Sequence, residues 1–315
     1  MKGIKLIQII ELFGGIGSPR IALRNIGIPV KSIDYVEIDE KAVRSYNEMF
    51  LNDLNYKTQT VVGWNLKPDI LIHGSPCQDF SIAGKQKGAD KGSETRSSLM
   101  WETLNIIKQM GAWKPRYVIW ENVKNVLSKH MIHNFNGYLK EMEKLGYTNS
   151  FEILDARDFG LPQARQRVFT VSVLGLESFD FSKMERTPTL HISHFLEDGV
   201  SEHYIVTQQS MLNRIGVKGT RFSRDCDIIK EYAMSITTKQ MRYPNSGVVQ
   251  LLDGRFRYLT EKECWRLQGY SDEDFEAALR VNPTKGKCLN GALYKQAGNS
   301  IPVTIFESMF KAILL

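Results

Sequence analysis

The sequence predicts an α/β protein: a doubly wound, parallel or mostly parallel sheet with helices on both faces, followed by a smaller irregular domain. In the first half of the chain, short apolar runs alternate with segments of helical periodicity, which is typical of such a sheet. After about residue 176 this alternation is lost until about residue 250, and turn signals such as TPTLH and RYPNSG replace it.

The expected strands are short apolar runs that end at polar or glycine-rich loops. They cover residues 6–13, 33–38, 69–73, 116–120 and 168–174. The expected helices cover residues 19–26, 39–50, 98–110 and 135–145. Ser18 and Asp39 are the expected N-caps of the first two helices, with Pro19 at the first helical position and Gly27 past the end of that helix.

Regular structure is expected to return near the C-terminus. Thr260 and Glu263 form a capping box for a helix, and residues 302–315 form a last, apolar helix that packs back on the first domain. We therefore expect a main domain over residues 1–178, a second domain over residues 179–250, and a return segment over residues 251–315 that completes the first domain.

The composition excludes several classes of protein. The 315 residues include four cysteines, Cys77, Cys226, Cys264 and Cys288, which are far apart, so neither a metal site nor a disulfide framework is expected. No apolar run is long enough to span a membrane, and the start MKGIKLIQIIELFGG is too quickly polar for a signal peptide. We therefore expect a cytoplasmic protein. The net charge of +6 suits a polyanionic partner without requiring one.

A glycine-rich turn follows the first expected strand, in the order Phe13-Gly14-Gly15-Ile16-Gly17-Ser18. A plain strand-to-helix turn would explain the same glycines. The spacing does not fit G-x-G-x-x-G, which argues against a dinucleotide and so against a dehydrogenase. Glu37 ends the next strand, where a carboxylate can accept both hydroxyls of a ribose. S-adenosylmethionine fits, because it has a ribose and no phosphate.

Cys77 follows the third expected strand, directly after Pro76, and leads into a long polar loop over residues 78–97. A free cysteine is usually buried and structural. Here the residue lies past the strand end, and the loop after it is too polar to bury it. Long loops in compact domains are often functional lids, and glycines at 84, 88 and 92 make this one flexible.

Polar residues also end the neighbouring strands. Glu121 and Asn122 follow residues 116–120, which sets a carboxylate on the same sheet edge as Cys77. Arg165 and Arg167 are two residues apart, so on an extended segment they face the same way and can clamp an anion or a carbonyl. A solvated glutamate and a surface arginine pair are the plainer interpretations.

Together these motifs identify a family. The chain resembles the DNA (cytosine-5)-methyltransferases of bacteria and phages, through ELFGGIGS, VEIDE, GSPCQDFS, ENVKNV, QARQR, RYLTEKECWRLQGY and QAGNSIPV, in that order from Glu11 to Val303. The resemblance implies the Rossmann-like fold of S-adenosylmethionine-dependent methyltransferases, with a small irregular target-recognition domain. It also implies methyl transfer to carbon-5 of a flipped cytosine in a short sequence of double-stranded DNA, with S-adenosyl-L-homocysteine as product and no metal.

The resemblance assigns the catalytic roles. Cys77 would add to carbon-6 of the cytosine, and Glu121 would hold the N3/N4 edge and help to protonate N3. Arg165 would hold the O2 of the base and a nearby phosphate, whereas Arg167 would brace the loop. The loop after Cys77 would be a lid that closes over the DNA from the minor-groove side, because the target base must leave the stack.

The resemblance also assigns the cofactor contacts. They are Phe13, Gly15 and Gly17 at the methionine end, Glu37 at the ribose, Ile38 at the adenine face, and Asn299 and Ser300 closing the site, with Ile16 and Pro76 as further contacts. The family's usual Gly-Asp pair after its third strand is absent, since Gly63 is followed by Trp64. An oxygen of Asn65 or of the backbone would have to replace the acidic contact to adenine.

The target-recognition segment would lie within residues 179–250, which are rich in Arg and Lys. Arg, Asn and Gln are the side chains that most often recognise bases in the major groove. The expected DNA contacts are Gln78, Ser81, Lys85 and Arg96 on the lid and Arg221, Arg224, Thr238, Lys239 and Arg242 in this segment.

Other functions remain open at this point. A transfer RNA cytosine-5 methyltransferase would use the same scaffold, but its Cys-Phe-Thr signature is absent, since Cys226 is followed by Asp227. A binding-only relative is disfavoured because Cys77, Glu121 and Arg165 are all present. We expect a monomer, since one lid and one recognition domain can grip a duplex without symmetry. The sequence leaves both kinds of enzyme open: one with a cognate restriction endonuclease as partner and a lone methylase.

Overall fold

A computed structural model describes residues 6–51, 68–74, 99–217, 226–286 and 288–315. Its centre is a sheet in the strand order β2 (Val30–Val36), β1 (Ile7–Leu12), β3 (Ile70–His73), β4 (Tyr117–Val123), β7 (Gln166–Leu174) and β5 (Tyr147–Asp155). The first four strands are parallel, whereas β7 runs antiparallel to both β4 and β5. The prediction of a mostly parallel sheet is thus confirmed.

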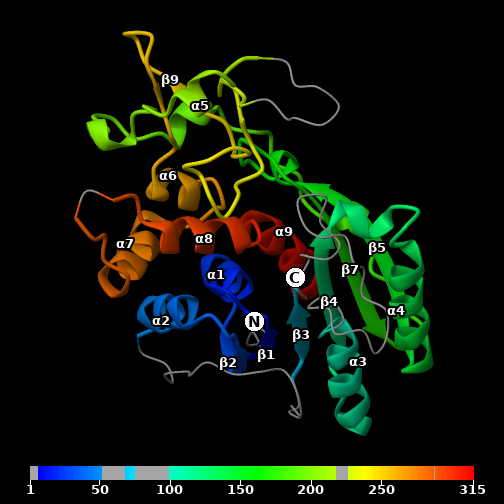
Figure 1. The fold of residues 1–315 in the computed structure, drawn as a ribbon. Helices are drawn as coiled ribbons and strands as arrows, with labels where there is room; N and C mark the ends of the chain where they lie inside the picture. The colour runs from blue at the N-terminus through cyan, green and yellow to red at the C-terminus, as the bar shows by residue number, and fades with distance from the viewer. Residues whose placement is uncertain (1–5, 52–67, 75–98, 218–225, 287) are drawn as a thin grey trace.

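Helices cover both faces of this sheet (Figure 1). One face packs against α1 (Ser18–Asn25), α8 (Gly291–Asn299) and α9 (Val303–Leu314). The other face packs against α3 (Met100–Gln109) and α4 (Ile132–Lys144). Alternation within the strands builds both cores, since Ile7 and Ile9 face the first layer while Ile10 and Leu12 face the second.

Helix α2 (Glu40–Met49) lies beside the β2 edge. Helix α7 (Asp272–Val281) packs against α2. Asp39 caps α2 as predicted, accepting a hydrogen bond from the backbone N–H of Lys41 at 3.0 Å. The capping box of Thr260 and Glu263 is also present at the start of α6 (Glu261–Arg266).

Some boundaries differ from the predictions. Gly17, not Ser18, is the N-cap of α1, and no side chain caps this helix. Ser18 instead bonds the hydroxyl of Tyr270 at 2.6 Å. Strand β5 was not predicted, because its sequence YTNSFEILD lacks a continuous apolar run and lies at the edge of the sheet. Helix α4 begins three residues earlier than expected, at Ile132.

The region after the sheet is irregular, as the sequence predicts. Its described residues form short pieces only: η5 (Phe181–Lys183), η6 (Ile192–His194), η7 (Glu202–Tyr204), α5 (Gln209–Leu212), β8 (Ala233–Met234), and the hairpin of β9 (Val249–Gln250) and β10 (Phe256–Arg257). A small core of Val206, Met211, Cys226, Val248 and Tyr258 holds it together. The expected boundary at residue 250 falls inside this hairpin, so the division into domains stays a prediction.

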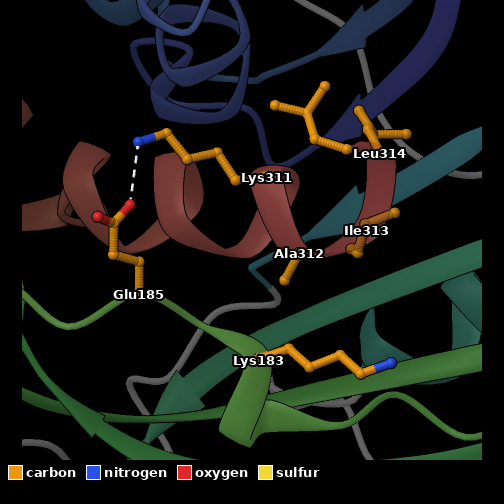
Figure 2. A pocket seen from close by; sticks show the side chains of 7 residues that line it. Lys183, Glu185, Lys311, Ala312, Ile313 and Leu314 are labelled. Atoms are coloured by element: carbon orange, nitrogen blue, oxygen red, sulfur yellow. Dashed lines mark hydrogen bonds and ion pairs between the residues drawn. The ribbon is translucent and has the colours of Figure 1, made fainter.

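The described residues contain no helix with the length and apolar character that crossing a bilayer requires. Within the same ranges, no three His, Cys, Asp or Glu side chains gather as metal ligands would. A hollow lies between η5 and the end of α9, lined by Lys183, Glu185 and residues 311–315. Figure 2 shows Lys311 paired with Glu185 there, at 3.3 Å. None of the expected site residues lines this hollow.

Candidate active site

The glycine turn connects the carboxyl end of β1 to α1. Phe13 has φ 57°, Gly15 φ 55° and Gly17 φ 77°. A positive φ is unfavourable for a bulky residue such as Phe13, and such strain is often found at ligand sites. The turn is fixed by backbone bonds from Gly14 N to Val36 O (3.1 Å) and from Gly17 N to Gly14 O (2.9 Å).

Glu37 follows β2 and lies against this turn. Its Oε2 accepts the N–H of Gly15 at 2.9 Å, and its Oε1 accepts the N–H groups of Ile38 and Asp39, each at 2.7 Å. A carboxylate offers about four acceptor sites, so about one remains, on Oε2. One ribose hydroxyl could bind directly; a second would require the carboxylate to release an amide. The neighbouring Ile38 is 80% exposed, an unusual state for isoleucine that leaves an apolar surface for a ring to stack on.

The end of α8 approaches the glycine turn. Lys295 forms an ion pair with Asp39 at the start of α2. The hydroxyl of Tyr270 bonds Ser18, and burial raises the pKa of Tyr270 against the lowering effect of hydrogen bonds to Ser18 and Ser300. Asn299 is exposed at the end of α8 and available to a ligand, whereas Ser300 is buried.

Glu121 lies near the carboxyl end of β4, with its side chain 12% exposed. Its Oε1 is 3.0 Å from Nε of Arg167. A Cβ placed on Gly74 would lie 3.7 Å from the Oε2 of Glu121 and 3.8 Å from Cδ1 of Ile301. The ends of β3 and β4 and the segment after α8 therefore meet at this carboxylate.

Burial raises the pKa of the Glu121 carboxyl, whereas the positive charges of Arg167 and Arg165 lower it, and burial has the larger effect. A carboxyl with a raised pKa retains its proton closer to neutral pH, so it can donate a hydrogen bond as well as accept one. The geometry thus provides an acid held by an arginine at the open edge of the sheet.

Arg165 has a different environment from Arg167. Its side chain is buried, and it donates to three backbone carbonyls: Nη1 to Ile236 at 3.0 Å, and Nη2 to Gly298 at 3.1 Å and Ser300 at 2.9 Å. The two arginines also do not belong to one continuous strand, because Arg165 separates β6 (Gln163–Ala164) from β7. Both act electrostatically on Glu121, but only Arg167 forms an ion pair with it.

The segment at residues 236–239 is fixed to this centre. Gln163 accepts the N–H of Ile236 at 2.8 Å, while Arg165 binds the carbonyl of the same residue. A Cβ on Gly298 would lie 2.4 Å from the backbone of Thr237 and Thr238, so helix and segment are in direct backbone contact. Thr238 is half-buried beyond this anchor, and Lys239 and Arg242 are exposed.

A family model of the C-5 cytosine-specific DNA methylases matches residues 7–315. The type II methyltransferase M2.ScrFI of Lactococcus lactis subsp. cremoris is 33% identical, over 98% of this chain and 99% of its own length. The type II methyltransferase M.HhaI of Haemophilus parahaemolyticus is 28% identical, over 96% of this chain and 92% of its own length. The chain belongs to the C-5 cytosine-specific DNA methylases.

Solved structures share the fold of this methylase. The S. pombe Dnmt2 methyltransferase superposes with a TM-score of 0.74, at 23% identity and over 98% of both chains. A putative DNA modification methyltransferase encoded within an E. coli prophage gives a TM-score of 0.65, at 18% identity. At these identities the likeness shows the α/β fold alone, whereas the family model supports DNA over the transfer RNA alternative.

Several expected site residues of the methylase lie outside the described ranges. They are Cys77 and Pro76, the expected lid residues Gln78, Ser81, Lys85 and Arg96, and the expected recognition residues Arg221 and Arg224. Gly63, Trp64 and Asn65, where the sequence departs from the family's Gly-Asp pair, also lie outside these ranges. Their roles stay predictions. Among the described residues, Glu37 lies against the glycine turn of Phe13, Gly15, Ile16 and Gly17, and Glu121 lies with both arginines.

Sequence reasoning missed residues that support the methylase site without any motif of their own. Tyr35 and Tyr46 lie beneath the glycine turn, Gln163 and Tyr270 connect distant segments, and Gly74 lies against Glu121. The sequence could have indicated Gly74, since this residue opens the GSPC motif. It gave no indication of a role for Tyr35 and Tyr46, because apolar packing alone would also explain them.

Proposed function

We propose that this methylase transfers a methyl group from S-adenosylmethionine to carbon-5 of a cytosine within a short specific sequence of double-stranded DNA, leaving S-adenosyl-L-homocysteine. The observation that carries the proposal is the environment of Glu121. Its carboxyl group is paired with Arg167 and lies beside Gly74, three residues before Cys77 in the chain. An acid and the segment leading to a cysteine nucleophile thus share one sheet edge with the glycine turn.

The chemistry begins at Cys77. Its thiolate adds to carbon-6 of the cytosine, which removes the aromaticity of the ring and makes carbon-5 an enamine carbon. Glu121 holds the N3/N4 edge and donates a proton to N3, so the charge that addition pushes into the ring is neutralised. S-adenosylmethionine, when bound, supplies the methyl group that carbon-5 takes up. Loss of the carbon-5 proton to solvent then expels the Cys77 thiolate, N3 returns its proton to Glu121, and the ring regains its aromaticity.

The raised pKa of Glu121 supports its role as the acid, because burial keeps the carboxyl protonated closer to neutral pH. The contacts of the two arginines favour the reverse of the expected roles. Arg167, which pairs with Glu121, would face the base, whereas Arg165, which binds three backbone carbonyls, would brace the segments around it.

The cofactor would occupy the edge of β1 and β2. The glycine turn would hold its methionine end, one acceptor site of Glu37 its ribose, and the exposed Ile38 its adenine. Asn299 would close the site from α8. The fit rests on the apolar surface of Ile38 beside a carboxylate and on a turn that brings backbone groups close to a ligand.

DNA would lie between the catalytic and recognition parts. Residues 1–178 and 251–315 would form the catalytic domain, and residues 179–250 the target-recognition domain. The target base must leave the stack to reach Glu121. Thr238, Lys239 and Arg242 are suited to contact the duplex, since they follow a segment fixed to Arg165 and Gln163.

We further propose that the enzyme acts as a cytoplasmic monomer in a bacterium or phage-infected cell. Its relatives include type II methyltransferases and orphan phage methyltransferases such as M.SPRI of Bacillus phage SPR. A cognate restriction endonuclease would therefore be a partner if this enzyme is a type II methyltransferase, but not if it is an orphan methyltransferase. Light scattering after size exclusion, with and without DNA, would report the monomer or a dimer.

Expression in a host without cytosine methylation, followed by bisulfite sequencing, tests the activity. We expect one short sequence to resist conversion, and Cys77→Ala and Glu121→Gln to abolish the protection. Full conversion of the host DNA by the wild-type protein would overturn the proposal on DNA. Methylation of host RNA in the same cells would then establish the transfer RNA alternative.

A further inference from the structure

Two tyrosine rings form a platform beneath the glycine turn. Tyr35 lies on β2 and Tyr46 on α2, both with no exposed surface. Their ring centroids are 3.8 Å apart with an interplanar angle of 24°. We propose that Tyr35, supported by Tyr46, is a positioning residue that holds the turn in the shape that binds S-adenosylmethionine; this inference rests on the proposed function.

The shape of the turn matches the two rings. A Cβ on Gly14 would lie 2.6 Å from Cδ2 of Tyr35, and a Cβ on Gly17 would lie 2.6 Å from Cε2 of Tyr46. Carbon atoms in contact prefer separations of about 3.5 to 4.0 Å, so neither position accepts a side chain while the rings stay in place. Gly14 has no positive φ, so its need for glycine comes from its neighbours rather than from backbone conformation: chiefly the Tyr35 ring, with Cβ of Glu11 second at 3.3 Å.

The hydroxyl of Tyr35 fixes the central residue of the turn. It donates to the carbonyl of Gly15 at 2.6 Å, while the N–H of Gly15 donates to Glu37 at 2.9 Å. Gly15 is thus held on both sides, and one of its two partners is the carboxylate assigned to the ribose. Loss of the Tyr35 hydroxyl would let the peptide group between Gly15 and Ile16 rotate. Movement of Gly15 would then also weaken its hydrogen bond to Glu37.

A buried polar network keeps the second ring in place. Tyr46 donates to Oε2 of Glu11 at 2.5 Å and accepts from Nη1 of Arg20 at 3.1 Å. The Arg20 guanidinium lies 4.1 Å from the ring centre of Phe50. Hydrogen bonds to charged partners are stronger than neutral ones, so Tyr46 is the fixed member of the stack and Tyr35 rests on it.

Tyr35→Phe keeps the stacked ring and removes only the hydroxyl. We expect its Kd for S-adenosylmethionine, measured by calorimetry, to rise about three- to tenfold, the range of one lost hydrogen bond. The KM for the cofactor should rise by the same factor, with kcat at saturating cofactor unchanged, because the hydroxyl touches no reacting atom. A Kd within twofold of the wild-type value would overturn the inference.

Tyr147→Phe is the matched control. Tyr147 is a buried tyrosine whose hydroxyl donates to the carbonyl of Pro115 at 2.8 Å, on the β5 edge away from the turn. It should lose similar stability and no cofactor affinity, and an equal loss of affinity in both variants would reject a specific role for Tyr35. Failure of the wild-type protein to bind S-adenosylmethionine would instead reject the proposed function.

The fit between Gly14 and Tyr35 has its own test in a double-mutant cycle. Gly14→Ala should raise the Kd at least tenfold in the wild-type background. The Tyr35→Val background lacks the clashing ring atoms, and valine suits a strand. In this background Gly14→Ala should raise the Kd by a factor at least three times smaller. An equal rise in Kd in both backgrounds would show that Tyr35 does not restrict position 14, and circular dichroism would verify that each variant folds.

Discussion

At the residue scale, the two arginines of QARQR differ in what they stabilise. Arg165 is buried and donates to three backbone carbonyls, whereas Arg167 forms an ion pair with the largely buried carboxylate of Glu121. The sequence singles out both arginines but does not predict that they have different contacts. The prediction placed them on one extended segment, whereas the break between β6 and β7 turns the two side chains to different partners.

This difference predicts that truncating Arg165 mainly lowers stability, whereas truncating Arg167 mainly lowers the methylation rate. Arg165→Ala leaves three carbonyls without their donor, so the free energy of unfolding should fall by about 3 kcal/mol. Arg167→Ala leaves the buried Glu121 carboxyl without its partner, a loss that the carboxyl offsets by taking up a proton. This variant should therefore be destabilised less than Arg165→Ala, but its methylation rate should fall by at least about tenfold. Urea denaturation and single-turnover rates measure the two quantities. Equal destabilisation by both variants would contradict the assignment.

The pH dependence of the rate tests Glu121 as the acid. Burial raises its pKa and Arg167 lowers it. The protonated form is the one that donates to N3, so the rate should fall as pH rises through the pKa of Glu121. Arg167→Ala removes the lowering effect, and the alkaline limb of the profile should move to higher pH.

Its control is Arg157→Ala, which breaks a comparable pair with Asp155, 2.8 Å apart. That variant should leave the profile unchanged. An alkaline limb that stays in place in Arg167→Ala would mean that Glu121 does not set it.

At the element scale, helix α8 contacts the segment that we propose to be part of the recognition domain. The contact is at Gly298, against the backbone of Thr237 and Thr238. Gly298→Ala should displace this segment and weaken DNA binding at least tenfold, measured by fluorescence anisotropy, while the Kd for S-adenosylmethionine changes less than twofold.

The same helix provides the control. A Cβ on Gly291 would meet no atom within 4 Å, so Gly291→Ala should leave DNA binding intact and stabilise the helix slightly. Equal DNA affinity in both variants would show that contact at Gly298 does not position the recognition segment.

Elements with strong local signals were predictable, and those held by tertiary contacts were not. The buried parallel strands have continuous apolar runs, and the caps at Asp39 and Thr260 use short polar side chains, so both could be predicted. Strand β5 has neither a continuous apolar run nor a strict alternation, lies at a sheet edge and depends on β7 for its pairing. The N-cap at Gly17 also escaped prediction, because Ser18 turns to Tyr270, far along the chain.

At the scale of the whole molecule, the sheet edge gathers segments that are distant in sequence. The glycine turn, Glu121 and the end of α8 meet there because β1, β3 and β4 are parallel and end together. Motif order predicted this convergence. The contacts that hold it, such as Tyr35 on Gly15 and Arg165 on Gly298, involve backbone carbonyls and so have no sequence pattern.

The charge of the molecule predicts how DNA binding responds to salt. Each cation that neutralises a phosphate releases counterions, so the slope of log affinity against log salt reports the number of such contacts. Lys239 and Arg242 are exposed beyond the anchored segment, within a chain of net charge +6. Replacing either by Ala should weaken binding to every DNA sequence and reduce the slope by about one.

Lys140→Ala is the control for overall charge, because Lys140 is exposed on α4, in the layer on the opposite face of the sheet from α8. It lowers the net charge by the same amount and should leave the slope unchanged, since only cations in contact with phosphates release counterions. Titrations of a short duplex between about 50 and 200 mM salt cover the range in which such slopes are measured. If all three variants reduced the slope equally, DNA would respond to the total charge rather than to a defined face, and the placement of the duplex beside residues 238–242 would be wrong.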